Sequence, residues 1–371
     1  MKTMKLSYLL LILLLSSHSS FSQNTILAFE PGKNDSKQMQ APERTIKDLG
    51  SSGIEISYQF FNAGISQLML DRGEFHFIHI KDLNKMDQVG KPALPCRNDF
   101  VALPPGAIAE IQIVEIEYKE YAGYMVHPAL EPALDLVGAP EPEFIIDEKT
   151  YSSNRFFPEK VVEEAAIQKW RGIPLSLIQI RPVQFNPVTG VIRVYSKIKY
   201  RVNFTGKNNG FDELASANSL HFTNMLKRVV LNSNSIPNGI DLPSFHPQQR
   251  NLSVRKDYII LAPAEYWMAA DSLATWKRQM GYSVDIVLKD NWTTNQIQDS
   301  ISTRYNAWFP RPDFFVLIGD NEQMPAQLVG TQNNIHSDLY YACMDGVGDF
   351  FPDMAKGRIS VSSQWRPLMW L

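Results

Sequence analysis

The hydrophobic period of this chain changes at Asp257, and that change constrains its fold more than any other feature. In residues 191–204, apolar side chains alternate with arginine, lysine and asparagine. A period of two indicates a strand with one buried face and one solvated face. After Asp257, apolar runs at 258–262 and 314–318 are separated by segments with helical spacing. Such runs are typical of strands buried on both faces. The sequence therefore predicts two parts with different folds.

The N-terminal part is predicted to be an antiparallel β-sandwich. Strands are expected at 73–80, 108–118, 175–185 and 191–204, with a proline- and glycine-containing turn at 186–190 between the last two. Several such strands with short joints favour a sandwich. Four basic residues of the last strand are interpreted as its solvated face, with a docking patch as the alternative: Arg193, Lys197, Lys199 and Arg201.

The C-terminal part is predicted to be α/β. Apolar residues at 269, 273, 276 and 280 have helical spacing, and Thr293 with Gln296 matches a capping box that opens a second helix. The order strand–helix–strand–helix–strand predicts a parallel sheet with right-handed crossovers. Ligands of such sheets bind beyond the carboxyl ends of the strands. Here these ends include Gly319 and Asp320.

The predicted organisation begins with a secretory signal peptide over residues 1–22, which directs the chain to the cell envelope or the exterior. Two lysines precede an apolar run at 6–15, and small residues precede the expected cut. The alternative, an uncleaved anchor, is disfavoured because a membrane span needs about 20 apolar residues. The remaining predicted segments are a polar leader (23–50), a β-rich domain (51–230), a linker (231–255) and an α/β domain (256–371).

Charge and cysteine content exclude two classes of protein. A net charge of −3 argues against a nucleic-acid partner held by phosphate contacts. Two cysteines, Cys96 and Cys343, are too few for a disulfide scaffold in an exported chain of 371 residues. We interpret them as separate half-buried thiols, with a disulfide between them as the alternative. No later segment is apolar for long enough to span a membrane.

Residues 336–353 contain the densest group of chemically active side chains. Asp345, Asp349 and Asp353 (with Asp338) are candidate calcium ligands, and glycines lie at 346 and 348. Calcium takes several carboxylate and carbonyl oxygens, and the glycines let carbonyl groups turn inward. The alternative is a polar surface loop whose carboxylates cap its own amide groups.

Two other roles are open for the same region. Asp338, Asp320 or Glu322 is a candidate for the base of a substrate pocket, where a carboxylate would select a basic side chain. His336 and Cys343 are a less favoured candidate for a catalytic pair, because such pairs usually stand on the ends of separate strands.

Several short motifs resemble the gingipain-type cysteine peptidases, family C25. They are Gly-Asp at 319–320, Ser-Asp at 337–338, Asp-Gly at 345–346, Pro-Asp at 352–353 and Gly-Arg at 357–358. Pro-Ala-Leu-Pro at 92–95 and Val-Ala-Leu-Pro-Pro-Gly at 101–106 resemble the propeptide of that family. The resemblance implies a secreted cysteine endopeptidase zymogen that acts on proteins or peptides. It also implies a caspase-like peptidase fold, a prodomain that contacts and blocks the peptidase domain, and structural calcium without an organic cofactor.

The catalytic pair of the family has no counterpart in these 371 residues. The family uses a His-Gly pair and a later cysteine, but no His-Gly pair follows residue 257. We therefore expect the pair beyond Leu371, only the N-terminal half of the peptidase domain in this sequence, and no catalytic activity of residues 1–371. The alternative function is a secreted binding or protease-inhibitory protein made of the prodomain and a remnant α/β domain.

Overall fold

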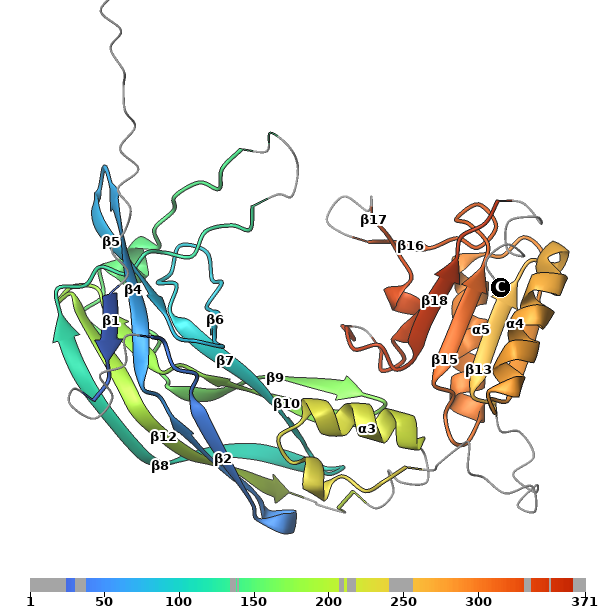
Figure 1. Ribbon diagram of the computed structural model, residues 1–371, viewed down its shortest axis with the longest axis horizontal. Helices are drawn as coiled ribbons and strands as arrows, with labels where there is room; N and C mark the ends of the chain where they lie inside the picture. The colour runs from blue at the N-terminus through green and yellow to red at the C-terminus, as the bar shows by residue number, and fades with distance from the viewer. Residues whose placement is uncertain are drawn as a thin grey trace, which may run out of the picture.

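The computed structural model describes residues 25–30, 38–133, 138, 140–206, 210–211, 218–239, 256–329, 335–346 and 348–362. The predicted signal peptide and most of the predicted linker lie outside these residues. Figure 1 shows a β-rich N-terminal part beside a smaller α/β part, with helix α3 and the β9–β10 hairpin between them. Within the described residues, no helix is long and apolar enough to cross a membrane.

The described residues of the N-terminal part form three antiparallel sheets, with strand orders β1-β4-β5, β6-β7-β10-β9 and β11-β12-β3-β2, and β8 pairs with β12. The strands are β1 (Thr25–Ala28), β2 (Glu43–Asp48), β3 (Gly53–Gln59), β4 (Asn62–Leu70), β5 (Gly73–His79), β6 (Asn84–Lys85), β7 (Pro95–Ala102), β8 (Ala107–Ala122), β9 (Val162–Trp170), β10 (Ile173–Ile180), β11 (Val183–Asn186) and β12 (Val191–Gly206). The helices are α1 (Glu148–Tyr151) and α3 (Leu220–Val229).

Strand β12 shows the predicted alternation. Ile192, Ile198 and Val202 are fully buried in the largest hydrophobic core. The basic residues on the other face are neutralised by glutamates of neighbouring strands: Arg193 pairs with Glu120, Lys197 with Glu115, and both Lys199 and Arg201 with Glu55. This pattern supports a solvated face with cross-strand ion pairs.

The predicted leader and linker differ from the structure. Two strands of the predicted leader, β1 and β2, pair with β4 and β3, so the sheets of the N-terminal part begin before residue 51. Ile236 of the supposed linker is buried with Phe222 and Leu226 of α3, so the N-terminal part extends beyond residue 230. Residues 240–255 lie outside the described residues.

The α/β part has the predicted parallel sheet, with strand order β14-β13-β15-β18. Alternate residues of β13 face opposite helices: Ile259 packs with Ile297 of α5, whereas Ile260 packs with Leu273 of α4. This two-sided burial explains the continuous apolar run. The elements are β13 (Tyr258–Ala262), α4 (Trp267–Gln279), β14 (Val284–Leu288), α5 (Thr294–Ala307), β15 (Phe314–Ile318), β16 (Gln327–Val329), β17 (Ile335–Ser337), the 3₁₀ turn η5 (Leu339–Ala342) and β18 (Ala355–Ile359).

Candidate functional site

The carboxyl end of β15 is a tight turn at Gly319 and Asp320. Gly319 has φ 135°, and a Cβ atom there would lie 2.8 Å from Cγ of Met324, so a larger residue is excluded by both conformation and space. Oδ1 of Asp320 accepts a hydrogen bond from the Asn321 amide at 2.9 Å, and Glu322 is exposed. Asp320 therefore shapes the turn with one carboxylate oxygen.

Asp338 is joined to this turn by an arginine. Nε and Nη2 of Arg358 on β18 donate to the two carboxylate oxygens of Asp338 at 2.8 and 2.7 Å. Nη1 of Arg358 donates to the carbonyl oxygens of Gly319 and Met324 at 3.0 and 2.7 Å. A basic substrate group would have to compete with Arg358 for Asp338. The substrate-binding role of Asp338, Asp320 and Glu322 stays a prediction.

The three candidate calcium ligands lie together before β18. One carboxylate oxygen from each of Asp345, Asp349 and Asp353 lies within 4.8 Å of the others. The loop is shaped by its own carboxylates, because Asp349 accepts the amide of Asp345 at 3.0 Å and that of Phe351 at 2.9 Å. The cluster therefore has the three carboxylates of the predicted calcium site, and one of them also caps amide groups of its own loop, as the alternative interpretation predicts.

Asp353 is the most strongly perturbed member of the cluster. It is 1% exposed, and burial, followed by the charges of Asp345 and Asp349, raises its pKa to about 7. Its oxygens accept the amides of Met344 at 2.6 Å and of Arg171 at 2.5 Å, which partly offset this effect. Crowded buried carboxylates are stabilised by a cation, and oxygen-only ligands suit calcium.

The structure places His336 and Cys343 in environments that do not favour nucleophilic catalysis. His336 is exposed on β17, and Cys343 follows η5. Burial and the nearby charges of Asp349 and Asp353 raise the pKa of the Cys343 thiol to about 12, which disfavours the nucleophilic thiolate. Among the described residues, no hydrogen bond joins Cys343 to a histidine side chain. Both cysteines are free thiols, as predicted.

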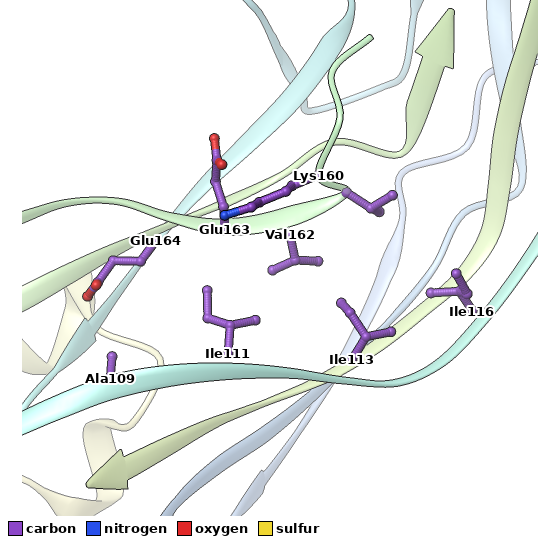
Figure 2. Close-up of a pocket in the computed structure, with 9 residues that line it drawn as sticks. Ala109, Ile111, Ile113, Ile116, Lys160, Val162, Glu163 and Glu164 are labelled. Atoms are coloured by element: carbon purple, nitrogen blue, oxygen red, sulfur yellow. The ribbon is translucent and has the colours of Figure 1, made fainter. Parts of the chain in front are cut away.

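A groove of about 580 Å³ lies between β8 and β9 of the N-terminal part (Figure 2). Ile111 and Ile113 of β8 face Val162 of β9 across the groove, and Glu163 and Glu164 lie on the β9 side. Its lining residues include no serine, cysteine or histidine, so the groove offers no nucleophile–base pair.

Arg171, in the loop between β9 and β10, is a functional residue that the sequence did not reveal. Its amide and that of Gly172 donate to Asp353 and Asp345, from positions more than 170 residues away along the chain. An arginine followed by a glycine between two strands indicates a turn, but it does not indicate which residues the turn will contact.

Comparison with known proteins identifies the family. Residues 35–230 match the family model Propeptide_C25, and residues 251–365 match that of peptidase family C25. The chain therefore belongs to peptidase family C25 and carries the propeptide of that family.

The matched relatives are longer proteins. The chain is 25% identical over 329 residues to Lys-gingipain of Porphyromonas gingivalis, covering 84% of this chain and 18% of the relative. It is 19% identical over 341 residues to gingipain R2 of the same organism, covering 90% of this chain and 44% of the relative. A solved complex of the RgpB pro- and mature domains from P. gingivalis aligns with a TM-score of 0.45 at 18% identity, over 52% of this chain and 100% of that chain.

Proposed function

We propose that this chain is the propeptide and first peptidase subdomain of a secreted or envelope-bound cysteine endopeptidase zymogen. The proposal rests on the contact between the propeptide and the α/β part. In this contact, Nη2 of Arg171 forms a buried ion pair with Oδ1 of Asp313 at 3.0 Å. A zymogen needs such an intramolecular contact. The substrates would be proteins or peptides, and the signal-like residues 1–22 support export.

The chemistry of such a peptidase is thiolate attack on a peptide carbonyl, with a histidine that transfers the proton to the leaving amine. Because no His-Gly pair follows residue 257 and Cys343 is held as a thiol, residues 1–371 alone would not hydrolyse peptide bonds.

To test this, the DNA after the codon for Leu371 is sequenced and translated in all three frames. Any continuation that encodes a His-Gly pair and a later cysteine is then expressed with the chain as one protein. We expect peptidase activity that thiol alkylation abolishes in the extended protein, and none in residues 23–371. Activity of the unextended chain that disappears in Cys343→Ala would contradict this assignment.

A calcium ion bound by Asp345, Asp349 and Asp353 is the proposed structural cofactor. The support is the convergence of three carboxylate oxygens within 4.8 Å and the raised pKa of Asp353. The ion would neutralise the crowded charge and stabilise the folded loop.

Removal of calcium should therefore lower the melting temperature. A ligand at about 100 times its dissociation constant adds about 2.7 kcal/mol to the free energy of unfolding. Asp349→Asn should reduce this calcium effect, whereas Asp299→Asn, at an exposed position on α5, should leave it unchanged. Equal melting temperatures in calcium and in chelator would exclude the site.

The alternative function is a protease-inhibitory protein, in which the propeptide that contacts the α/β part would bind a related C25 peptidase. Titration of residues 23–371 against an active C25 peptidase distinguishes the two functions. Nanomolar inhibition would support the inhibitor, and no effect at high micromolar concentration would exclude it.

A further inference from the structure

The β9–β10 hairpin ends in a turn whose sequence is locally unfavourable. Trp170 pairs with Ile173, so Arg171 and Gly172 form a two-residue loop, with φ values of 53° and 76°. Two-residue loops with two positive φ values favour asparagine or aspartate before glycine. A non-glycine residue with positive φ costs free energy, and such residues persist where the surrounding structure compensates. Arg171 is therefore expected to have a compensating contact.

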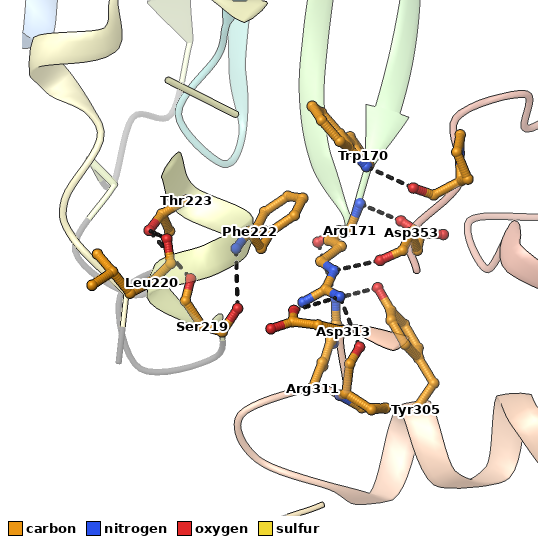
Figure 3. Close-up of polar contacts among 12 residues, drawn as sticks. Trp170, Arg171, Ser219, Leu220, Phe222, Thr223, Tyr305, Arg311, Asp313 and Asp353 are labelled. Carbon is orange, nitrogen blue, oxygen red and sulfur yellow. Dashed lines mark hydrogen bonds and ion pairs between the residues drawn. The ribbon is translucent and has the colours of Figure 1, made fainter. Parts of the chain in front are cut away.

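The compensating contact lies in the α/β part. The Arg171 side chain is 1% exposed, and its Nε donates to the carbonyl oxygen of Asp353 at 2.7 Å (Figure 3). Its Nη2 donates to the carbonyl oxygen of Pro312 at 2.7 Å and lies 3.0 Å from Oδ1 of Asp313, whose side chain is 3% exposed. An arginine fork is suited to several acceptors at fixed angles, whereas a lysine is not.

The backbone of the turn is also bound by the α/β part. The Arg171 amide donates to Asp353 at 2.5 Å, and the Gly172 amide donates to Asp345 at 3.0 Å. In return, Nη1 of Arg311 donates to the carbonyl oxygen of Arg171 at 3.0 Å. Three backbone groups that an isolated hairpin would present to water are therefore hydrogen-bonded across the interface.

Aromatic side chains surround this contact. Trp170 donates from Nε1 to the carbonyl oxygen of Pro352 at 3.0 Å, and its ring centroid lies 6.0 Å from that of Phe351. The Arg171 guanidinium lies 4.5 Å from the ring centroid of Phe222 on α3. A buried arginine surrounded by aromatic rings is the usual composition of an interface hot spot.

The contact lies at the amino-terminal edge of the parallel sheet. Asp313 directly precedes β15, and Asp353 precedes β18 by two residues. Ligands of such sheets bind at the opposite, carboxyl edge, where Gly319 and Asp320 lie. The contact is therefore placed to hold the propeptide without occupying the edge at which catalysis is expected.

We propose that Arg171 is the residue that anchors the propeptide to the peptidase domain, and that it does so at the amino-terminal edge of the parallel sheet, away from the carboxyl edge. The inference rests on the proposed division into propeptide and peptidase domain. Its test measures association of the two parts and not peptide hydrolysis, so a failure of this inference is distinguishable from a failure of the proposed function.

The experiment uses the full chain with a specific protease site inserted in residues 240–255 and cut after purification. The dissociation constant of the two parts is measured by dilution and gel filtration. The variant Arg171→Asn removes the guanidinium but suits the turn, so the propeptide keeps its hairpin. We expect the dissociation constant to rise at least about 100-fold, because Asp313 would remain as a buried unpaired charge.

The matched control is Arg72→Asn, at the exposed tip of the β4–β5 hairpin, and it should leave the dissociation constant unchanged. Asp313→Asn tests the contact from the other side. If the two substitutions act through one ion pair, the double variant should lose much less affinity than the two single losses combined. An Arg171→Asn variant that associates within threefold of the unchanged chain would overturn the proposal, as would unchanged parts that separate at micromolar concentration.

Discussion

Arg358 connects three separate segments of the α/β part. It forms a bidentate ion pair with Asp338 and donates to the carbonyl oxygens of Gly319 and Met324. The side chains of Arg358 and Asp338 are 15% and 18% exposed, so solvent screens this pair less than a surface pair. The loop that precedes β18 is therefore fastened to the carboxyl edge of the sheet.

Substitution of Arg358 should destabilise the α/β part. Arg358→Ala leaves the Asp338 carboxylate and two carbonyl groups without their donor, and we expect a loss of about 2 kcal/mol in the free energy of unfolding. Urea unfolding measures this loss. Arg278→Ala is the control, because the pair Arg278–Asp271 is 3.8 Å long and exposed, and its removal should cost less than about 0.5 kcal/mol. Equal losses in the two variants would contradict the assigned role.

At the residue scale, contacts between residues close together in the sequence could be predicted, whereas contacts between distant residues could not. The grouping of Asp345, Asp349 and Asp353 could be predicted because all three belong to one short glycine-containing loop. Asp338 could be selected as a notable carboxylate, but its pairing with Arg358 could not. Arg171 was missed because its partners lie more than 140 residues later and become neighbours only when the two parts dock.

Helix α5 begins as the sequence predicted. The Thr293 side chain accepts the amide of Gln296 at 3.3 Å, and the Gln296 side chain accepts the amide of Thr293 at 3.2 Å. Thr293→Ala should lower the free energy of unfolding by about 1 kcal/mol, because the Gln296 amide loses its side-chain acceptor. Thr293→Ser keeps the hydroxyl group and should lose much less in the same urea experiment. A Thr293→Ala variant as stable as the unchanged chain would exclude a stabilising cap.

We expect His127 to make the stability of the propeptide depend on pH. Its ring stacks on Phe77 at 4.4 Å between centroids, and burial lowers its pKa, with a smaller contribution from Lys85 and an opposing hydrogen bond to Pro128. The folded state therefore binds the proton less readily than the unfolded state, whose histidine pKa is about 6.5. This contribution is present above about pH 6.5 and is lost as the pH falls.

The free energy of unfolding of the propeptide should therefore decrease between pH 7 and pH 5. His127→Asn, which does not titrate in this range, should show a shallower decrease in urea unfolding at the same pH values. Identical slopes for the two proteins would show that His127 does not contribute.

At the element scale, β12 and β13 were predictable because burial leaves a clear apolar pattern in their sequences. Strand β12 alternates because it packs on the main core, and β13 is uniformly apolar because helices cover both faces. Strand β2 was missed because all six of its residues are exposed, so backbone pairing with β3 leaves no apolar period in the sequence. An edge strand of this kind gives little signal to periodicity analysis.

At the scale of the whole molecule, the change of period at Asp257 predicted the order of the two folds but not their contact. The contact buries one arginine of the propeptide against Asp313 and pairs the backbone of its turn with the peptidase domain. The interface and the candidate calcium site share Asp345 and Asp353. Docking of the propeptide and the conformation of the acidic loop are therefore physically connected.

The most direct test of this arrangement is amide hydrogen exchange of Arg171 and Gly172 in the full chain. When the β9–β10 hairpin is docked, both amides donate to carboxylates of the peptidase domain, so their hydrogens should exchange slowly. Asp313→Asn should make this exchange faster. The exposed β4–β5 tip at Asp71 and Arg72 is the internal reference. Slow exchange at 171 and 172 beside fast exchange at 71 and 72 is the expected result. Equally fast exchange at both tips would contradict a propeptide anchored to the peptidase domain.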